Sequence, residues 1–199
     1  VALAGIGTAC EFHGADPDAV RSNVEEAKAY AQLAADTGAP GIKVRPNGIR
    51  EDIGVEASCE QIGVALGEVA RHASGLGVAV RLEVHGRESS RPAYIRKMID
   101  HAAHPNARVC WNSNPGDMDE AGSIADNFAL LQDFIGLVHI TEIGTYTYPW
   151  QDLFDRLKEA GYDGFCLAEI QYNPEPERFM KYYRTLFDLY TGGYAWPRT

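Results

Sequence analysis

The sequence predicts an α/β fold made of repeated strand–helix units, and three observations support this prediction. Six stretches carry apolar residues at helical spacing, and a short strand-like run precedes each of them. Glycine recurs where several of these helices should end. The strand–helix alternation has a period of about 30 residues, which is typical of βα units around a parallel sheet. The chain has 199 residues, 45% of them hydrophobic, and can supply the core that such a sheet needs.

The elements follow one another regularly along the chain. We expect strands over residues 1–9, 41–45, 78–85, 108–112, 137–141 and 165–170. The helices expected to alternate with them cover residues 19–37, 56–74, 92–102, 124–134, 150–160 and 175–190. Gly38, Gly75 and Gly161 follow three of these helices, and glycine adopts the left-handed cap conformation without a steric penalty. No linker or low-complexity tract interrupts the series, so we expect a single domain.

Residues 78–85 decide between the two arrangements of such units, a doubly wound sheet and a (β/α)8 TIM barrel. Their even positions are aliphatic, whereas Arg81, Glu83 and His85 lie at odd positions and therefore on the opposite face. A strand buried on both faces would be almost continuous Val, Ile and Leu. Lys43 and Arg45 repeat the pattern in the preceding strand. Charge on one face, toward the end of the strand, favours a TIM barrel with about six βα units present.

Composition narrows the classes of partner. The 28 acidic and 18 basic residues give a net charge of −10, which argues against binding nucleic acid or anionic membranes. No apolar run approaches the roughly 20 residues that span a bilayer. The four cysteines form no Cys-x-x-Cys pair, so we expect buried free thiols rather than disulfides or a zinc ribbon. The composition therefore predicts neither a nucleic-acid partner nor a membrane partner.

Polar side chains gather at the C-terminal ends of the predicted strands, where TIM barrels carry their chemistry. Four consecutive strands end in a polar residue, namely Glu83, Asn112, His139 and Glu169. Adjacent strands lie about 4.8 Å apart, so inward side chains from these ends can converge on one ion. Two carboxylates, an imidazole and an amide oxygen suit Mn2+, Mg2+, Co2+ or Zn2+ and exclude a soft thiolate site.

Each of these four residues also has a structural interpretation. Glu83 has Arg81 and Arg87 nearby as salt-bridge partners, and a histidine in an apolar strand is often a core residue with satisfied hydrogen bonds. Asn112 precedes a Ser-Asn-Pro-Gly segment that is typical of a turn. Glu169 ends an apolar strand, where an unpaired carboxylate is costly, and this favours a functional role.

The last predicted helix carries aromatic residues at helical spacing, which is typical of a core-packing or subunit-contact face. This pattern leaves a homo-oligomer open.

Four segments that follow one another in order carry a resemblance to a known family. They are residues 81–86 (RLEVHG), 109–114 (VCWNSN), 137–142 (LVHITE) and 161–169 (GYDGFCLAE). Together they resemble the xylose isomerase-like TIM-barrel superfamily, in particular its sugar phosphate isomerase/epimerase branch. The resemblance covers nearly the whole chain, from the first helix to Glu169.

The resemblance implies a divalent metal, with manganese first and magnesium, cobalt or zinc as alternatives. Glu83, His139 and Glu169 match three metal ligands of the family, and Asn112 stands at the position of the fourth. The two glutamates are implied to form an acid/base pair, in which one removes a proton next to a carbonyl and the other returns it. An enediolate is the implied intermediate, and the metal stabilises it.

The resemblance also implies substrate contacts. His85 and Lys43 are implied to face the substrate, where they read hydroxyls or a phosphate. His13, Asn114 and Glu142 lie at or just beyond strand ends and are further candidates for substrate binding.

Two departures from the family pattern concern the metal. Asn112 replaces the usual aspartate with a weaker, uncharged ligand, and Pro115 stands where many members carry a second histidine. Asp117 and Asp119, in the following loop, are candidate replacements.

The resemblance also bears on the length of the chain. The six units look like the third to the eighth of a barrel whose typical length is about 250 residues. We therefore expect residues 1–199 to be a single barrel domain that lacks about two N-terminal units.

The expected function is a divalent-metal-dependent isomerase or epimerase of a small sugar, keto-sugar or related polyol. One alternative is a metal-dependent dehydratase or lyase that acts on a cyclitol or an oxidised sugar. Another is a catalytically degenerate barrel that binds sugars. Hydrolysis of damaged DNA, also known in the superfamily, is disfavoured because the acidic surface would repel the phosphate backbone.

Overall fold

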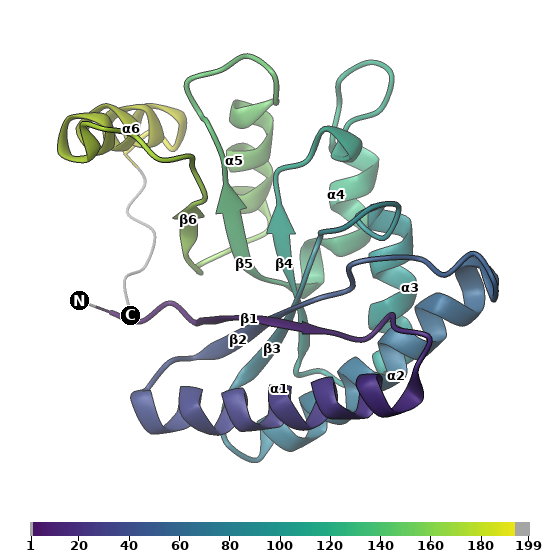
Figure 1. The fold of residues 1–199 in the computed structure, drawn as a ribbon. Coiled ribbons are helices and arrows are strands. Elements are labelled where there is room, and N and C mark those ends of the chain that lie inside the picture. Colours follow the sequence, from purple (N-terminus) through teal and green to yellow (C-terminus); the bar gives the residue numbers. More distant parts are fainter. Residues whose placement is uncertain (1, 194–199) are drawn as a thin grey trace.

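The fold, seen in a computed structural model that describes residues 2–193, is a curled parallel sheet wrapped by helices (Figure 1). The strands are β1 (Ile6–Glu11), β2 (Gly41–Arg45), β3 (Ala79–Glu83), β4 (Ala107–Asn112), β5 (Ile135–Ile140) and β6 (Cys166–Ala168). The helices are α1 (Pro17–Thr37), α2 (Gly54–Ser74), α3 (Pro92–Ala102), α4 (Ala125–Leu131), α5 (Trp150–Glu159) and α6 (Pro176–Tyr190). Two short 3-10 helices, η1 (Pro115–Asp117) and η2 (Gln132–Phe134), lie on either side of α4.

The sheet confirms the predicted barrel architecture with six βα units. Every neighbouring pair of strands is parallel, and the order in space, β1-β2-β3-β4-β5-β6, is the order in the chain. β1 and β6 are not paired with each other, so the described residues form an open, curled wall. All the strands run the same way, and their C-terminal ends therefore meet along one rim.

The predicted helices agree with the structure to within two residues at either end, and the fourth predicted helix, residues 124–134, is divided between α4 and η2. None of the described helices is long and apolar enough to cross a bilayer. The first strand is shifted from the predicted residues 1–9 to Ile6–Glu11, and Val1 lies outside the described residues. β1 is also irregular, because Gly7 pairs with Lys43 but Glu11 pairs with Arg45, so β1 carries extra residues between these pairs.

The glycine caps are partly as predicted. Gly38 and Gly161 are left-handed, with φ of 75° and 69°. The left-handed cap predicted at Gly75 is wrong, because the φ of Gly75 is −65° and its conformation continues the helix. The left-handed residue of that connection is Gly77, with φ of 70°.

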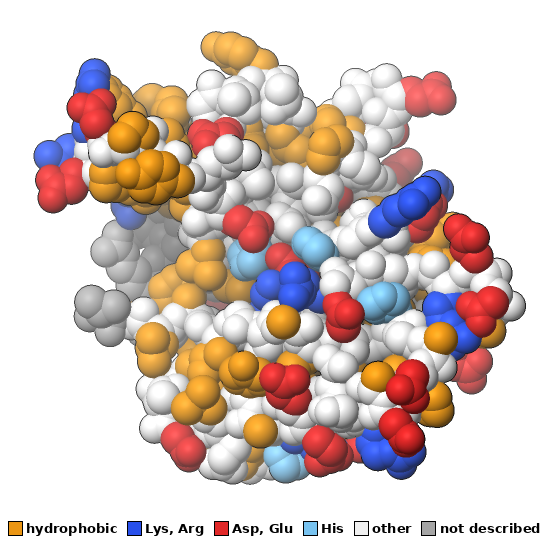
Figure 2. All heavy atoms as spheres, in the orientation of Figure 1, with side chains coloured by type: hydrophobic (Ala, Val, Ile, Leu, Met, Phe, Trp, Pro, Cys, Tyr) orange, Lys and Arg blue, Asp and Glu red, His pale blue; other side chains and the backbone are white. Residues whose placement is uncertain are grey.

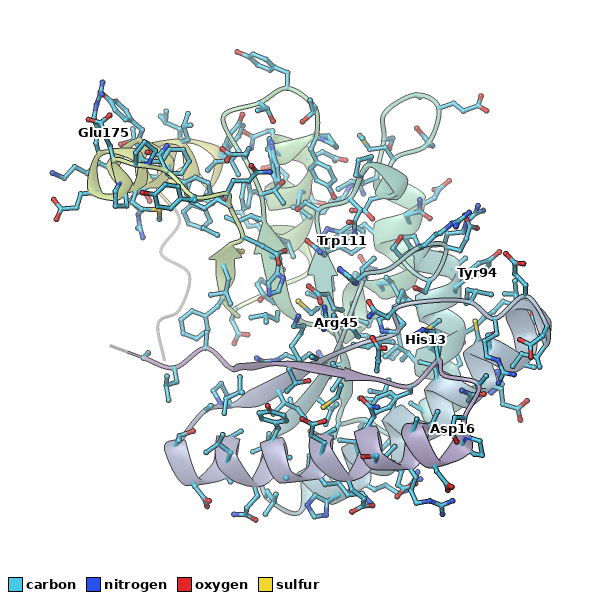
Figure 3. The ribbon with its side chains drawn as sticks, viewed as in Figure 1. His13, Asp16, Arg45, Tyr94, Trp111 and Glu175 are labelled. Carbon is cyan, nitrogen blue, oxygen red and sulfur yellow. The ribbon has the colours of Figure 1, made fainter. Side chains whose placement is uncertain are left out.

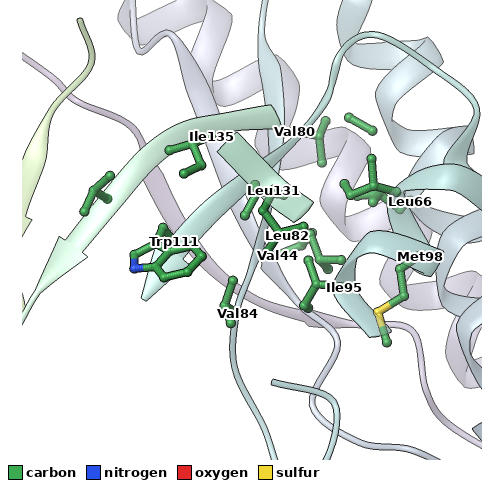
Figure 4. Close-up of a cluster of buried hydrophobic side chains, with 14 of the residues drawn as sticks. Val44, Leu66, Val80, Leu82, Val84, Ile95, Met98, Trp111, Leu131 and Ile135 are labelled. Carbon is green, nitrogen blue, oxygen red and sulfur yellow. The ribbon is translucent and has the colours of Figure 1, made fainter. Parts of the chain in front are cut away.

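The two faces of the wall differ in the way the strand patterns predicted. The outer face packs on the helices and contributes Val44, Val80, Leu82 and Val84 to a dry cluster with side chains of α2 and α3 (Figure 4). The inner face carries charged side chains. Arg81, only 7% exposed, lies there and donates from its Nη1 to the Ala4 carbonyl at 2.8 Å.

The aromatic stretch of α6 is divided between two environments. Tyr183 is buried and donates from its hydroxyl to the carbonyl oxygens of Ile140 and Thr141, at 3.1 and 2.7 Å, which ties the helix to the end of β5. Tyr182 and Leu189 are 62% and 71% exposed. The core-packing half of the expectation is therefore confirmed, and the oligomeric state stays a prediction.

All four cysteines are free thiols, as expected. Cys10, Cys59 and Cys110 are buried, and Cys166 is partly exposed. Burial raises the pKa of Cys59 to about 11 and that of Cys166 to about 12, so neither thiol is a reactive nucleophile near neutral pH.

Candidate metal centre

Three of the predicted ligands meet at the rim of the wall, where β3, β5 and β6 end. Glu83, His139 and Glu169 each offer one ligand atom, and these atoms all lie within 4.8 Å of one another. The register of the neighbouring strands brings these side chains together. His139 pairs with Leu167, two residues before Glu169, and it also pairs with Asn112 on β4. Because side chains alternate along a strand, these positions point to the same inner face.

The His139 ring lies between the two carboxylates. Its Nδ1 is 3.2 Å from Glu83 Oε1 and 3.3 Å from Glu169 Oε2. Nδ1 is buried, yet no described atom is aligned with it as a hydrogen-bond partner. A buried imidazole nitrogen without an aligned partner, between two carboxylate oxygens, is the arrangement expected of a ligand to a divalent cation. The nitrogen and oxygen donors also fit the hard and borderline metals.

Glu83 is held by a cation from the neighbouring strand. Lys43 Nζ lies 2.7 Å from Glu83 Oε2, and the Glu83 side chain is only 2% exposed. Burial by itself would raise the pKa of this carboxyl, but His139 and Lys43 more than offset it and lower the pKa to about 2. The salt-bridge interpretation of Glu83 was therefore right in kind, but its partner is Lys43 rather than an arginine. Glu169, with a side chain 53% exposed, is the carboxylate open to solvent.

Asn112 lies beside the triad but remains a predicted ligand. It is 7% exposed, ends β4 in register with His139, and its side chain makes no hydrogen bond to the described residues. It is a strand residue, so the turn interpretation does not hold.

The loop aspartates do not replace it. Asp117 is fully buried, and its Oδ2 accepts from Asn114 N at 2.8 Å and from the Tyr148 hydroxyl at 3.0 Å. Burial raises its pKa to about 7, since its donors are uncharged. Asp119 accepts from the backbone of Ala121 and Ser123. Each aspartate thus accepts hydrogen bonds from donors outside the triad, and neither belongs to the group of converging ligand atoms.

A second polar cluster lies on the same rim, at the ends of β1, β2 and β3. Asn47 Nδ2 donates to Glu11 Oε2, and Asn47 Oδ1 lies 2.9 Å from His85 Nδ1. Asn47 was not among the residues predicted from the sequence. The signal that could have found it is the Asn-Gly pair that comes one residue after the strand ending at Arg45, because Asn tolerates the left-handed conformation that such a turn needs.

The remaining predicted substrate-binding residues are distributed around this rim. Lys43 is engaged by Glu83. Asn114 uses its amide group to join two strand ends, donating to the carbonyls of Val84 and Asn112 at 2.7 and 2.9 Å. Glu142 is partly exposed in the loop after β5. His13, partly exposed and with a buried Nδ1 that has no partner among the described residues, follows β1.

Two cavities adjoin the clusters. One of about 250 Å³ lies inside the wall and is lined by Gly5, Ile6, Gly7, Lys43, Arg81, Leu137, His139 and Leu167. Another of about 540 Å³ opens between the loops after β1, β2 and β3, and its lining includes His13, Asn47 and Tyr94. Figure 2 shows histidine and basic side chains beside acidic ones in the middle of this face, and Figure 3 shows His13 and Arg45 there, close to β1.

Comparison with known proteins agrees with this architecture. A family model described as "Xylose isomerase-like TIM barrel" matches residues 1–186. No curated protein sequence gave a match. Several solved structures share the fold at low sequence identity. One is a D-tagatose 3-epimerase-like protein, with a TM-score of 0.77 and 16% identity over 96% of this chain and 79% of the other.

Two further structures are similar. The 3-keto-D-glucoside 4-epimerase of E. coli has a TM-score of 0.76 and 16% identity, over 94% of this chain and 78% of the other. An L-ribulose 3-epimerase has a TM-score of 0.74 and 19% identity, over 95% of this chain and 74% of the other.

Proposed function

The chain belongs to the xylose isomerase-like TIM-barrel family, and from this premise we propose that it is a divalent-metal-dependent isomerase or epimerase of a small sugar, keto-sugar or related polyol. The observation that carries the proposal is the meeting of Glu83, His139 and Glu169 at one rim of the sheet. Several structures of the same fold are sugar epimerases, which supports the choice of substrate class.

The residues that would hold the metal are Glu83, His139 and Glu169, with Asn112 as the fourth ligand. Manganese is the first choice, and magnesium, cobalt and zinc are the alternatives. A divalent ion bound there supplies a Lewis acid that polarises a carbonyl and favours the removal of a neighbouring proton.

The two carboxylates divide the proton transfers between them. Glu169 is half exposed, so a substrate entering from solvent can reach its oxygens. Glu83 is buried and kept ionised by Lys43, which fixes the position of its carboxylate. In the proposed reaction one glutamate takes the proton from the carbon next to the carbonyl, and the other delivers a proton to that carbon. Lys43 acts through Glu83 as a positioning residue.

The proposal is tested by metal analysis joined to turnover. The purified protein should contain about one divalent ion per site and should convert members of a ketose panel. Glu83→Gln and Glu169→Gln should each lose the ion and reduce turnover about 100-fold or more. Glu142→Gln, a strand-end acid outside the triad, is the matched control and should retain the metal.

Two results would count against the proposal. A protein with no stoichiometric metal, and no response to added Mn2+, Co2+, Zn2+ or Mg2+, would be a sugar-binding barrel rather than an enzyme. A product that has lost water or another leaving group would identify a dehydratase or lyase.

A further inference from the structure

A chain of three side chains links the ends of three strands beside the candidate metal centre. Glu11 ends β1, Asn47 lies two residues beyond β2, and His85 lies two residues beyond β3. The Asn47 amide joins the other two, since its Nδ2 donates to Glu11 and its Oδ1 lies 2.9 Å from His85 Nδ1.

The carboxylate of Glu11 determines which atom donates in each of these hydrogen bonds. A carboxylate only accepts hydrogen bonds, so the NH2 group of Asn47 must face Glu11. The amide oxygen must then face His85, and an oxygen cannot donate. His85 Nδ1 must therefore carry the proton, and in the neutral ring Nε2 is then a bare acceptor.

The backbone is shaped to bring the three side chains together. Asn47 has φ of 61°, in the left-handed region that costs energy for a residue other than glycine. Gly86 has φ of 93°, and a Cβ there would lie 2.7 Å from the Asn47 Cα. Only glycine allows this approach. The Ser89 hydroxyl also donates to the His85 carbonyl at 2.9 Å, which fixes the backbone at the histidine.

The second nitrogen of the His85 ring is left without a partner among the described residues. His85 follows Glu83 by two residues, and Val84 N still bonds the β4 carbonyl of Cys110 at 3.0 Å, so the extended course of β3 continues beyond its end. His85 Nε2 has no hydrogen-bond partner among the described residues, and the ring is partly exposed. Asn47 itself lines the 540 Å³ cavity.

We propose that Glu11 and Asn47 are positioning residues that lock His85 in the tautomer protonated on Nδ1, so that Nε2 accepts a hydrogen bond from a substrate hydroxyl next to the metal centre. This inference rests on the proposed function for the presence of a substrate, and it specifies that substrate as a polyol with a hydroxyl donor at this point. A site that presents a bare acceptor rejects an analogue lacking the hydroxyl, because the acceptor is left unpaired.

The tautomer is measured directly by long-range 1H–15N correlation spectra of 15N-histidine-labelled protein. The neutral His85 ring should show its proton on Nδ1. Asn47→Gly suits the positive φ and removes only the side chain. Glu11→Gln introduces a donor at residue 11, which allows the side-chain amide of Asn47 to flip. In both variants the form protonated on Nε2 should gain population. Glu51→Gln, on the wall of the same cavity, should leave the spectrum unchanged.

Kinetics provide the second readout. With a turned-over sugar, Asn47→Gly should raise KM about 3- to 10-fold, the effect of one lost hydrogen bond, with a smaller change in kcat and unchanged metal content. A wild-type His85 protonated on Nε2, or a KM that Asn47→Gly leaves unchanged, would overturn the inference. The spectra need neither substrate nor turnover, so an inactive protein would refute the proposed function separately.

Discussion

Two buried carboxylates, Glu83 and Asp117, show how the partners of a residue decide its chemistry. Glu83 is 1% exposed and Asp117 fully buried. Glu83 has the Lys43 ammonium at 2.7 Å and a pKa of about 2. Asp117 has only a backbone amide and a tyrosine hydroxyl, and its pKa is about 7. Burial opposes ionisation in both carboxyls, and it is overcome only in Glu83, by His139 together with the Lys43 ammonium.

Asp117 should make stability depend on pH. Its pKa is 3.8 unfolded and about 7 folded, so between these values the folded state holds more protons and stability falls as pH rises. The difference between the two pKa values corresponds to about 4 kcal/mol of the free energy of unfolding, which is lost by pH 8. Asp117→Asn removes this dependence and should be the more stable protein at pH 8. Urea unfolding at pH 5 and pH 8 measures the difference.

Asp119→Asn provides the comparison, because Asp119 accepts two backbone hydrogen bonds in the same loop without being buried. It should leave the pH dependence intact. An Asp117→Asn protein less stable than wild type at pH 8 would show that the carboxylate is ionised and paired.

Asn112 gives a prediction for the metal. Asn112→Asp restores a negative ligand at a strand end in register with His139, so Mn2+ affinity should rise about 10-fold or more. Asn112→Ala should not show this gain. Calorimetric titration with Mn2+ compares the three proteins, and equal affinity of Asn112→Asp and Asn112→Ala would place residue 112 outside the metal's reach.

The meeting of the three candidate ligands was predictable, because strand ends of a parallel sheet share one rim and the sequence shows which strands end in a carboxylate or a histidine. The contact of Lys43 with Glu83 could not be predicted in this way. This contact depends on the register of β2 against β3, where Lys43 pairs with Arg81 and so lies next to the residue two positions later. Nothing in either strand's own sequence specifies that register.

At the scale of the elements, helices α2 and α3 are in direct backbone contact through two glycines. A Cβ at Gly63 would lie 2.5 Å from the Met98 carbonyl oxygen, and one at Gly67 would overlap the carbonyl of Ala102. Glycine weakens an isolated helix, but here it allows the two helices to approach closely. Periodicity revealed both helices, whereas this contact requires knowing which faces meet.

Gly67→Ala should therefore destabilise the protein by about 1–3 kcal/mol, even though alanine is the better helix former. Gly75→Ala, at the end of the same helix, is the matched control, since its Cβ would find only His72 O at 3.5 Å and its φ is −65°. The control should be neutral or slightly stabilising. Chemical denaturation of both variants decides, and equal stabilities would contradict the close contact.

For the whole molecule, the main feature is that the wall formed by residues 2–193 has two free edges. Within that range β1 and β6 each pair on one side only, and residues of both edge strands, Ile6 and Leu167 among them, line the inner cavity. We propose that two further βα units stand between β6 and β1 and close the ring. The alternation of strands and helices predicted the barrel, but closure depends on strand tilt and stagger, which local patterns do not encode.

This proposal predicts the behaviour of the 199-residue chain alone. With both edges unpaired it should bind a hydrophobic dye and self-associate as its concentration rises, because free strand edges and apolar lining pair with other chains. Light scattering after size exclusion measures the association. A chain extended by two βα units should be free of both effects, and a monomeric 199-residue chain that binds no dye would argue against the missing units.

The four thiols lie in β1, α2, β4 and β6, which distributes them along the whole wall. The three buried thiols must be exposed by a local opening before an alkylating reagent can reach them, so the rates of modification would report how often each part of the structure opens. Cys166, on the short edge strand and already partly exposed, should react first. Cys110, in the interior strand β4, should wait for the opening of the sheet itself.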